Sequence, residues 1–161
     1  MSNQYEDIKQ RLRGSICPVI TPFKANGDID FEKQAKFMRI YVVDIQSQEQ
    51  TCVSPDGLQI WDFCWSPDGE HFAAVASDLP FETHWYLNRL VRFPASENQV
   101  ITLYDTDRMT SKPTWSPDGK TIAFTSSTWS DKYYVKGDVW VVPADGGECL
   151  DLTKGQTASY C

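Results

Sequence analysis

From Tyr41 onward, apolar and polar residues alternate in short runs with a period close to two. A period of two is that of a β-strand, whose successive side chains point to opposite faces of a sheet. Because no helical pattern of normal length separates these runs, the sequence predicts an all-β architecture. The predicted strands are YVVDI (41–45), DFCW (62–65), HFAAVAS (71–77), WYLNRLVRF (85–93), VITLYD (100–105), KPTW (112–115), TIAFTSS (121–127), DVWVVPA (138–144) and ECLDLT (148–153).

Residues 1–40 follow a different pattern, which predicts a short α/β leader separate from a second domain at 41–161. Asp30 can cap the N-terminus of a helix in which Phe31, Ala35 and Met38 fall on one face. The leader reads helix, strand, turn and helix, over QYEDIKQRLR (4–13), SICPVITPF (15–23), NGD (26–28) and FEKQAKFMRI (31–40).

One phrase, Trp-Ser-Pro-Asp-Gly, occurs twice, 50 positions apart. Proline presets φ for the second position of a turn, aspartate favours the third, and glycine tolerates positive φ at the bulge that follows. We therefore interpret both copies as structural hairpin turns that need no metal, and both tryptophans as packing anchors. The residues of this motif are Trp65, Ser66, Pro67, Asp68 and Gly69, and Trp115, Ser116, Pro117, Asp118 and Gly119.

The spacing of the strands is that of a β-propeller, in which each blade has four strands in roughly 40–50 residues. Residues 62–105 make one blade and 112–153 a second, whereas 41–53 supply only the outer two strands of a preceding blade. Closed propellers have about four to eight blades. The predicted fold is therefore mainly β, a partial β-propeller of about two and a half four-stranded antiparallel blades with a short N-terminal α/β leader.

Charge and composition narrow the choice of partner and compartment. The net charge is −7, with +2 on residues 1–40 and −9 on the rest, so we expect neither nucleic acid nor an anionic membrane as a partner. No apolar run reaches the roughly 18 residues of a membrane span, and the first residues lack the apolar core of a secretory signal. We expect a cytoplasmic protein. Its five cysteines show no C-x-x-C spacing, which favours free thiols over a zinc site or disulfides.

Residues 41 to about 160 resemble the β-propeller of the prolyl oligopeptidase family, especially its acylaminoacyl-peptidase-like branch. The blade motif is also shared with TolB-type and WD40-like repeats. The resemblance implies a propeller that controls access to a separate α/β-hydrolase domain with a Ser-Asp-His triad. It is carried by PDGLQIWDFCWSPDG (55–69), AAVASDLP (73–80), WSPDGKTIAFTSSTWSD (115–131) and GDVWVVPADGGECLDLT (137–153).

A second stretch, GSICPVITPFKANGDIDFEKQAKFM (14–38), resembles the start of the dihydrodipicolinate synthase/N-acetylneuraminate lyase family. That family has a TIM barrel and performs aldol chemistry through a lysine Schiff base. Thr21 and Pro22 match its first-strand pattern. Because the two resemblances belong to different families, we interpret the chain as a chimera joined near Ile40.

Neither resemblance brings a complete active site. The lyase family's Gly-Thr-Thr-Gly-Glu loop, tyrosine and Schiff-base lysine are missing, and Lys24, Lys33 and Lys36 are expected to be solvated. The chain has no G-x-S-x-G elbow for a nucleophilic serine, and its two histidines, His71 and His84, are expected at strand edges. We therefore predict no catalytic, cofactor-binding or metal-binding residue, and no cofactor.

The function predicted from the sequence is that of a non-catalytic propeller fragment with a structural or interaction role. Self-association through the open edges of the blades is the expected partnership, because unpaired strand edges and apolar faces attract one another. The alternatives are a serine peptidase of the acylaminoacyl or prolyl oligopeptidase type and a lyase of the dihydrodipicolinate synthase family. Both lack catalytic residues in this sequence.

Overall fold

The computed structural model describes residues 37–128, 137–157 and 160. In this part of the chain no helix combines the length and apolar character needed to cross a membrane. The elements are β1 (Tyr41–Val43), β2 (Gln50–Cys52), β3 (Gln59–Trp65), β4 (His71–Ser77), the 3₁₀-helix η1 (Glu82–Leu87), β5 (Arg89–Pro94), β6 (Ile101–Tyr104), β7 (Met109–Trp115), β8 (Thr121–Ser127), β9 (Asp138–Pro143) and β10 (Leu150–Asp151).

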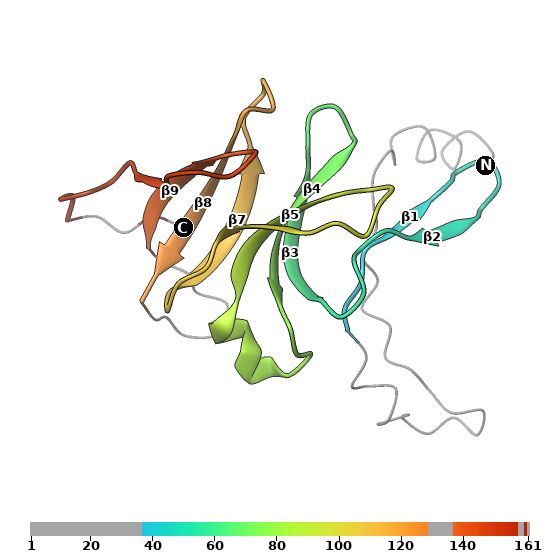
Figure 1. Ribbon diagram of the computed structural model, residues 1–161, viewed down its shortest axis with the longest axis horizontal. Coiled ribbons are helices and arrows are strands. Elements are labelled where there is room, and N and C mark those ends of the chain that lie inside the picture. The colour runs from blue at the N-terminus through green and yellow to red at the C-terminus, as the bar shows by residue number, and fades with distance from the viewer. Residues whose placement is uncertain (1–36, 129–136, 158–159, 161) are drawn as a thin grey trace, which may run out of the picture.

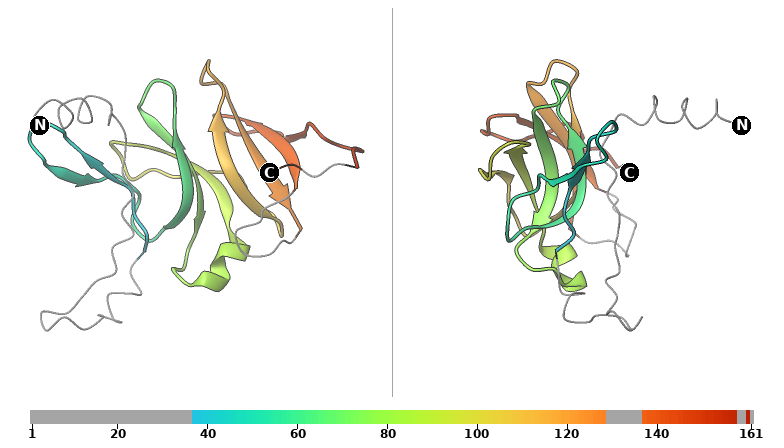
Figure 2. Two further views of the ribbon diagram at one scale, coloured as in Figure 1. Left: turned by 180° about the vertical axis from the view of Figure 1, so that it is seen from behind. Right: turned by 90° about the vertical axis from the view of Figure 1, so that its right-hand side faces the viewer.

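These strands form three antiparallel sheets that follow one another along the chain, as Figures 1 and 2 show. Blade 1 is the pair β1–β2, blade 2 is the sheet β3-β4-β5-β6, and blade 3 is the sheet β10-β9-β8-β7. Each four-stranded blade is a meander in which every strand pairs with the next one in sequence. The predicted fold class is confirmed: the described chain is mainly β, and its blades do not close a ring.

Several bounds of the predicted strands are wrong. Residues 85–87 belong to η1 and not to a strand, and β5 begins only at Arg89. The buried Asn88 causes this break, because its side-chain amide donates to the carbonyl of Trp85 at 2.7 Å and to that of Thr110 at 3.2 Å. β3 and β7 are longer than predicted, because residues from Gln59 and from Met109 onward pair with β4 and β8 respectively. β1 and β10 are shorter, at Tyr41–Val43 and Leu150–Asp151.

The last four residues of the helix predicted over 31–40 do not form a helix. Residues 37–40 are not helical, and the remainder of the predicted leader lies outside the described residues. The carbonyl of Met38 accepts a hydrogen bond from the amide of Ile60, and that of Ile40 accepts from Val53. Ile40 is fully buried between blades 1 and 2. Packing against the sheet therefore overrides the helical pattern of this segment.

Blade 2 is apolar on both faces and separates two hydrophobic layers. Because side chains alternate along a strand, Phe72 and Phe93 face blade 1, whereas Ala73 and Leu90 face blade 3. All four are fully buried. The layer toward blade 1 also contains Ile40, Leu58, Ile60, Ala74, Ala76 and Val91, and the layer toward blade 3 contains Leu103, Ile122, Phe124, Val142 and Ala144.

Three polar contacts fasten blade 2 to blade 3 around the second apolar layer. Asn88 Oδ1 accepts hydrogen bonds from the backbone amide and the hydroxyl of Thr110, at 2.8 and 2.7 Å. Asp62 Oδ2 accepts from the amide of Lys112 at 3.0 Å, where β7 bulges and Lys112 has a positive φ of 53°. The third contact joins Arg92 to Asp145 at 2.6 Å. We call these three contacts the interblade polar contacts.

Replacing Asn88 by alanine should lower the free energy of unfolding by about 2–3 kcal/mol, because it leaves the buried amide of Thr110 without its acceptor. Chemical denaturation followed by tryptophan fluorescence measures the loss. The matched control is Asn98→Ala, which removes one hydrogen bond at an exposed position and should cost less than about 0.5 kcal/mol. Equal costs at the two positions would contradict the role given to Asn88.

Candidate functional site

The first repeated turn, Ser66–Gly69, is held by its own side chains as well as by its backbone. The amide of Gly69 donates to the carbonyl of Ser66 at 3.0 Å, and Gly69 has a φ of 76°. Ser66 Oγ is buried; it donates to Asp68 Oδ1 at 2.5 Å and accepts from the amide of His71 at 2.9 Å. Asp68 therefore stabilises its own turn, which joins β3 to β4.

The second turn, Ser116–Gly119, repeats these bonds between β7 and β8. Ser116 Oγ donates to Asp118 Oδ1 at 2.6 Å and accepts from the amide of Thr121 at 3.0 Å, and Gly119 has a φ of 70°. A Cβ atom added to Gly119 would lie 3.9 Å from Pro67 Cδ, so the two turns are neighbours (Figure 1). The sequence indicated the proline and glycine roles but not the serine-to-aspartate hydrogen bond.

The two tryptophans of the motif lie in different apolar layers. Trp65 packs on Phe72, with ring centroids 3.9 Å apart, in the layer between blades 1 and 2. Trp115 packs against the layer between blades 2 and 3. Each tryptophan ends the first strand of its blade and pairs in register with a buried residue of the second strand. Their environment is that of interblade packing.

A third Ser-Pro-Asp-Gly segment, residues 54–57, has a different setting. It links β2 to β3, and so lies between blades instead of within a hairpin. The buried Ser54 Oγ accepts from the Nε of Arg39 at 2.7 Å and from the amide of Ile40 at 3.1 Å. Arg39 also pairs with Asp56 at 3.0 Å. This third Ser-Pro-Asp-Gly segment thus binds residues 39–40 to the blades.

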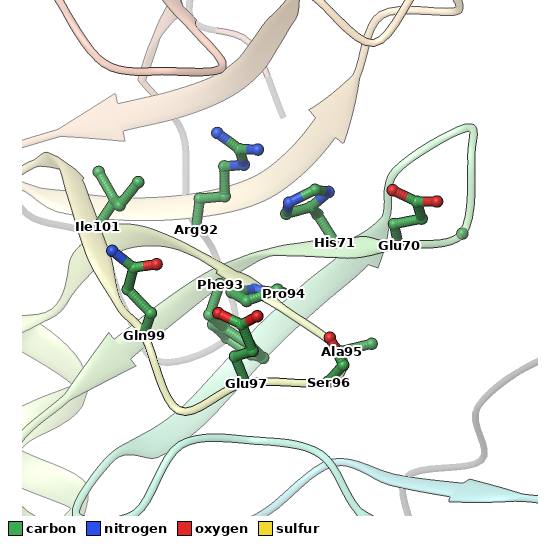
Figure 3. A pocket seen from close by; sticks show the side chains of 11 residues that line it. Glu70, His71, Arg92, Phe93, Pro94, Ala95, Ser96, Glu97, Gln99 and Ile101 are labelled. Atoms are coloured by element: carbon green, nitrogen blue, oxygen red, sulfur yellow. The ribbon is translucent and has the colours of Figure 1, made fainter.

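A hollow of about 600 Å³ lies beside the first turn, between β4, β5 and the loop after β5 (Figure 3). Figure 3 shows Glu70 and His71 at one end and Gln99 and Ile101 at the other, with Arg92 between them. The Arg92 guanidinium is already used, because its Nη1 donates to Asp145 Oδ1 at 2.6 Å and to the carbonyl of Ala144 at 3.2 Å. The hollow thus combines carboxylates with a cation that is paired across the blades.

Asp68, Glu70 and His71 form the group that most resembles a metal site among the described residues. One ligand atom of each lies within 4.8 Å of the others. The first turn explains this closeness, because Asp68 Oδ1 accepts from Ser66 Oγ and from the amide of Glu70. The same bonds, with that from Ser66 the strongest, lower the pKa of Asp68. Asp68 Oδ1 is thus an acceptor for two hydrogen bonds of the hairpin itself.

The two histidines of the chain lie on separate elements, His71 at the start of β4 and His84 in η1. His84 Nδ1 is 3.3 Å from the hydroxyl of Thr83. The nearby carboxylate of Asp78 is bound twice by Arg89, at 2.6 and 3.1 Å, and this contact, followed by the charges of Arg89 and His84, lowers the pKa of Asp78. Asp78 is therefore oriented by an arginine and not by an imidazole.

One face of blade 3 has no neighbouring sheet in the described chain. The register of β7 to β10 places on it Thr114, Ala123, Thr125, Val139, Val141 and Leu150, and Leu152 follows in the same alternation. Leu150 and Leu152 are 61% and 51% exposed. We call these seven residues, of which Thr125 is itself buried, the open face. It carries apolar residues where a propeller blade would contact the next blade.

Comparisons with known proteins agree with this geometry but do not assign a family. No family model matches the chain. A 4-hydroxy-tetrahydrodipicolinate synthase of Psychrobacter sp. (strain PRwf-1) is 49% identical over 35 residues, which are 22% of this chain and 12% of that protein. The uncharacterized peptidase YuxL of Bacillus subtilis (strain 168) is 26% identical over 96 residues, 60% of this chain and 14% of that one.

The solved structures show the fold. A TolB-like protein from Agrobacterium tumefaciens superimposes with a TM-score of 0.59 and 21% identity, over 81% of this chain and 47% of that one. This chain therefore spans less than half of that structure and about an eighth of each curated relative. Its fold is that of a TolB-like propeller that is not closed.

Removing the hydroxyl of Ser66 should raise the pKa of Asp68 toward its ordinary value of 3.8 and cost about 1 kcal/mol for the lost bond to the His71 amide. The folded pKa of Asp68 lies below that of the unfolded chain. The stabilisation it provides is present above the unfolded pKa and is lost as pH falls through the folded pKa.

Carboxyl-carbon NMR titration of Ser66→Ala measures this shift, and Asp118, whose pKa is lowered in the same way by Ser116, is the internal control. Asp118 should titrate as before in this variant, whereas Ser116→Ala should shift Asp118 alone. An unchanged pKa of Asp68 in Ser66→Ala would refute the proposed hydrogen bond from Ser66 to Asp68.

Proposed function

We propose that this chain is a non-catalytic propeller fragment with a structural or interaction-mediating role. The observation that carries the proposal is the open face of blade 3, where Leu150 and Leu152 stay largely exposed. Exposed contiguous apolar surface on a folded domain typically marks a contact site for another molecule. The open ring of blades leaves this surface available.

The propeller part is derived, in this proposal, from the kind that gates a serine peptidase. The local identity of 26% with a peptidase supports this origin, and the TolB-like fold is compatible with it. The 49% identity with a dihydrodipicolinate synthase over only 35 residues supports a second origin for part of the chain. A junction near Ile40 accounts for both.

Chemical considerations favour a binding role over catalysis. The Cys64 thiol is a weak nucleophile at neutral pH, because burial raises its pKa to about 11. Asp68 is used by its turn and Asp78 by Arg89, so neither carboxylate orients a histidine toward a hydroxyl. These arrangements stabilise hairpins and loops.

The purified full-length chain should not hydrolyse acylaminoacyl or prolyl peptide substrates, and a fluorophosphonate probe should label none of its serines. The reason is that a serine nucleophile requires a base and an orienting acid held next to it. An active serine hydrolase, assayed in parallel, is the positive control. Turnover that the probe abolishes would refute the proposal and support the peptidase alternative.

The lyase alternative has its own test. Incubation with pyruvate and borohydride should add no mass to the intact protein, because a solvated lysine keeps its proton and forms Schiff bases poorly. A covalent adduct on a single lysine would favour the lyase.

A further inference from the structure

We propose that the open face of blade 3 pairs with the same face of a second copy of this chain, so that the protein is a twofold-symmetric dimer. This inference rests on the proposed interaction role and names the partner. The paired surfaces would be two sheets packed face to face, about 10 Å apart. The contact would remove Leu150 and Leu152 from water.

The repeat shows that the open face occupies positions made for burial. Arg92 pairs with Ile101 in blade 2 as Val141 pairs with Leu150 in blade 3. Beyond Thr102, a bulge in β6 places both Leu103 and Tyr104 where blade 3 has Leu152. Leu103 is only 6% exposed because blade 3 covers it, whereas Leu152 is 51% exposed. The open face therefore continues an interface that already exists between blades 2 and 3.

The open face nevertheless lacks the interblade polar contacts. By the same register, Gly137 stands where blade 2 has Asn88, and Val141 stands where it has Arg92. Counting back from the two motif tryptophans, Lys112 stands where blade 2 has Asp62. Gly137 and Val141 have no side-chain hydrogen-bonding group, and a lysine ammonium cannot accept the backbone bond that Asp62 accepts. The face thus has the apolar residues of a blade contact without the groups that specify a following blade.

The shape of the rest of the molecule favours the same face on the partner. A blade that joined in head-to-tail fashion would need to present an aromatic and aliphatic face such as that of Ile122 and Phe124, or of Phe72 and Phe93. In this chain both of those faces are already buried, against blade 2 and blade 1 respectively. Of the two four-stranded sheets, only blade 3 thus has an apolar face, the open face, that a second copy can cover. A self-complementary patch of this kind gives a twofold dimer.

Light scattering on the full chain after size exclusion should give twice the monomer mass at micromolar concentration. Leu150→Glu and Leu152→Glu should each halve that mass, because a buried carboxylate opposes association. The matched control is Leu87→Glu, which changes a leucine of η1 that is somewhat more exposed, at 68%. Circular dichroism verifies that each variant remains folded. A monomeric unmodified chain, or a dimer that only Leu87→Glu disrupts, would overturn the proposal.

A mixing experiment separates the twofold dimer from a head-to-tail assembly. The proposal places Leu150, on the edge strand β10, beside the twofold axis, so that position 150 of one copy lies close to position 150 of the other. Leu150→Lys and Leu150→Glu should therefore each be monomeric alone and form a heterodimer when mixed. A mixture that stays monomeric would rule out the symmetric contact. Activity assays are independent of these results, so a monomer without peptidase or lyase activity would refute the dimer alone, and a dimer with activity would refute the non-catalytic role alone.

Discussion

A sheet that is apolar on both faces needs a neighbour on each side, and this requirement governs the whole molecule. Blade 2 satisfies it: Phe72 and Phe93 are buried against blade 1, and Ala73 and Leu90 are buried against blade 3. In the part of the chain that the structure describes, blade 3 has a neighbouring sheet on one side only, where Ile122 and Phe124 are buried. The same alternation that builds the core therefore leaves Leu150 and Leu152 exposed at the end of the row.

Polar groups fix how the blades meet, whereas apolar groups supply most of the driving force. Hydrophobic packing is not directional, so alone it would tolerate some sliding of one sheet on another. Asn88, Asp62 and Arg92 remove that freedom by bonding to fixed points on blade 3. The absence of equivalent groups on the open face therefore distinguishes a specified interblade contact from a more permissive one.

The carboxylates that look best suited to binding a ligand instead stabilise the fold. Asp68 and Asp118 could suggest a cation site, yet each accepts a hydrogen bond from the serine two positions before it and from a backbone amide two positions after it. A carboxylate in this position closes a tight hairpin. The two turns, 50 residues apart, have the same pattern of hydrogen bonds, which favours a structural function for the repeated Trp-Ser-Pro-Asp-Gly motif.

The sequence alone was sufficient for most of the strands, the two hairpin turns and the number of blades, because alternation and turn residues act locally, as HFAAVAS and TIAFTSS illustrate. Only the tertiary structure decided that Asn88 interrupts the run at 85–93, that residues 37–40 leave the helical pattern, and that Arg92 reaches Asp145. The first and last of these features depend on partners 22 and 53 positions away. The second depends on Val53, just after β2, and on Ile60 in β3. Local pattern carries no information about which distant group will satisfy a buried amide or guanidinium, because folding alone brings them together.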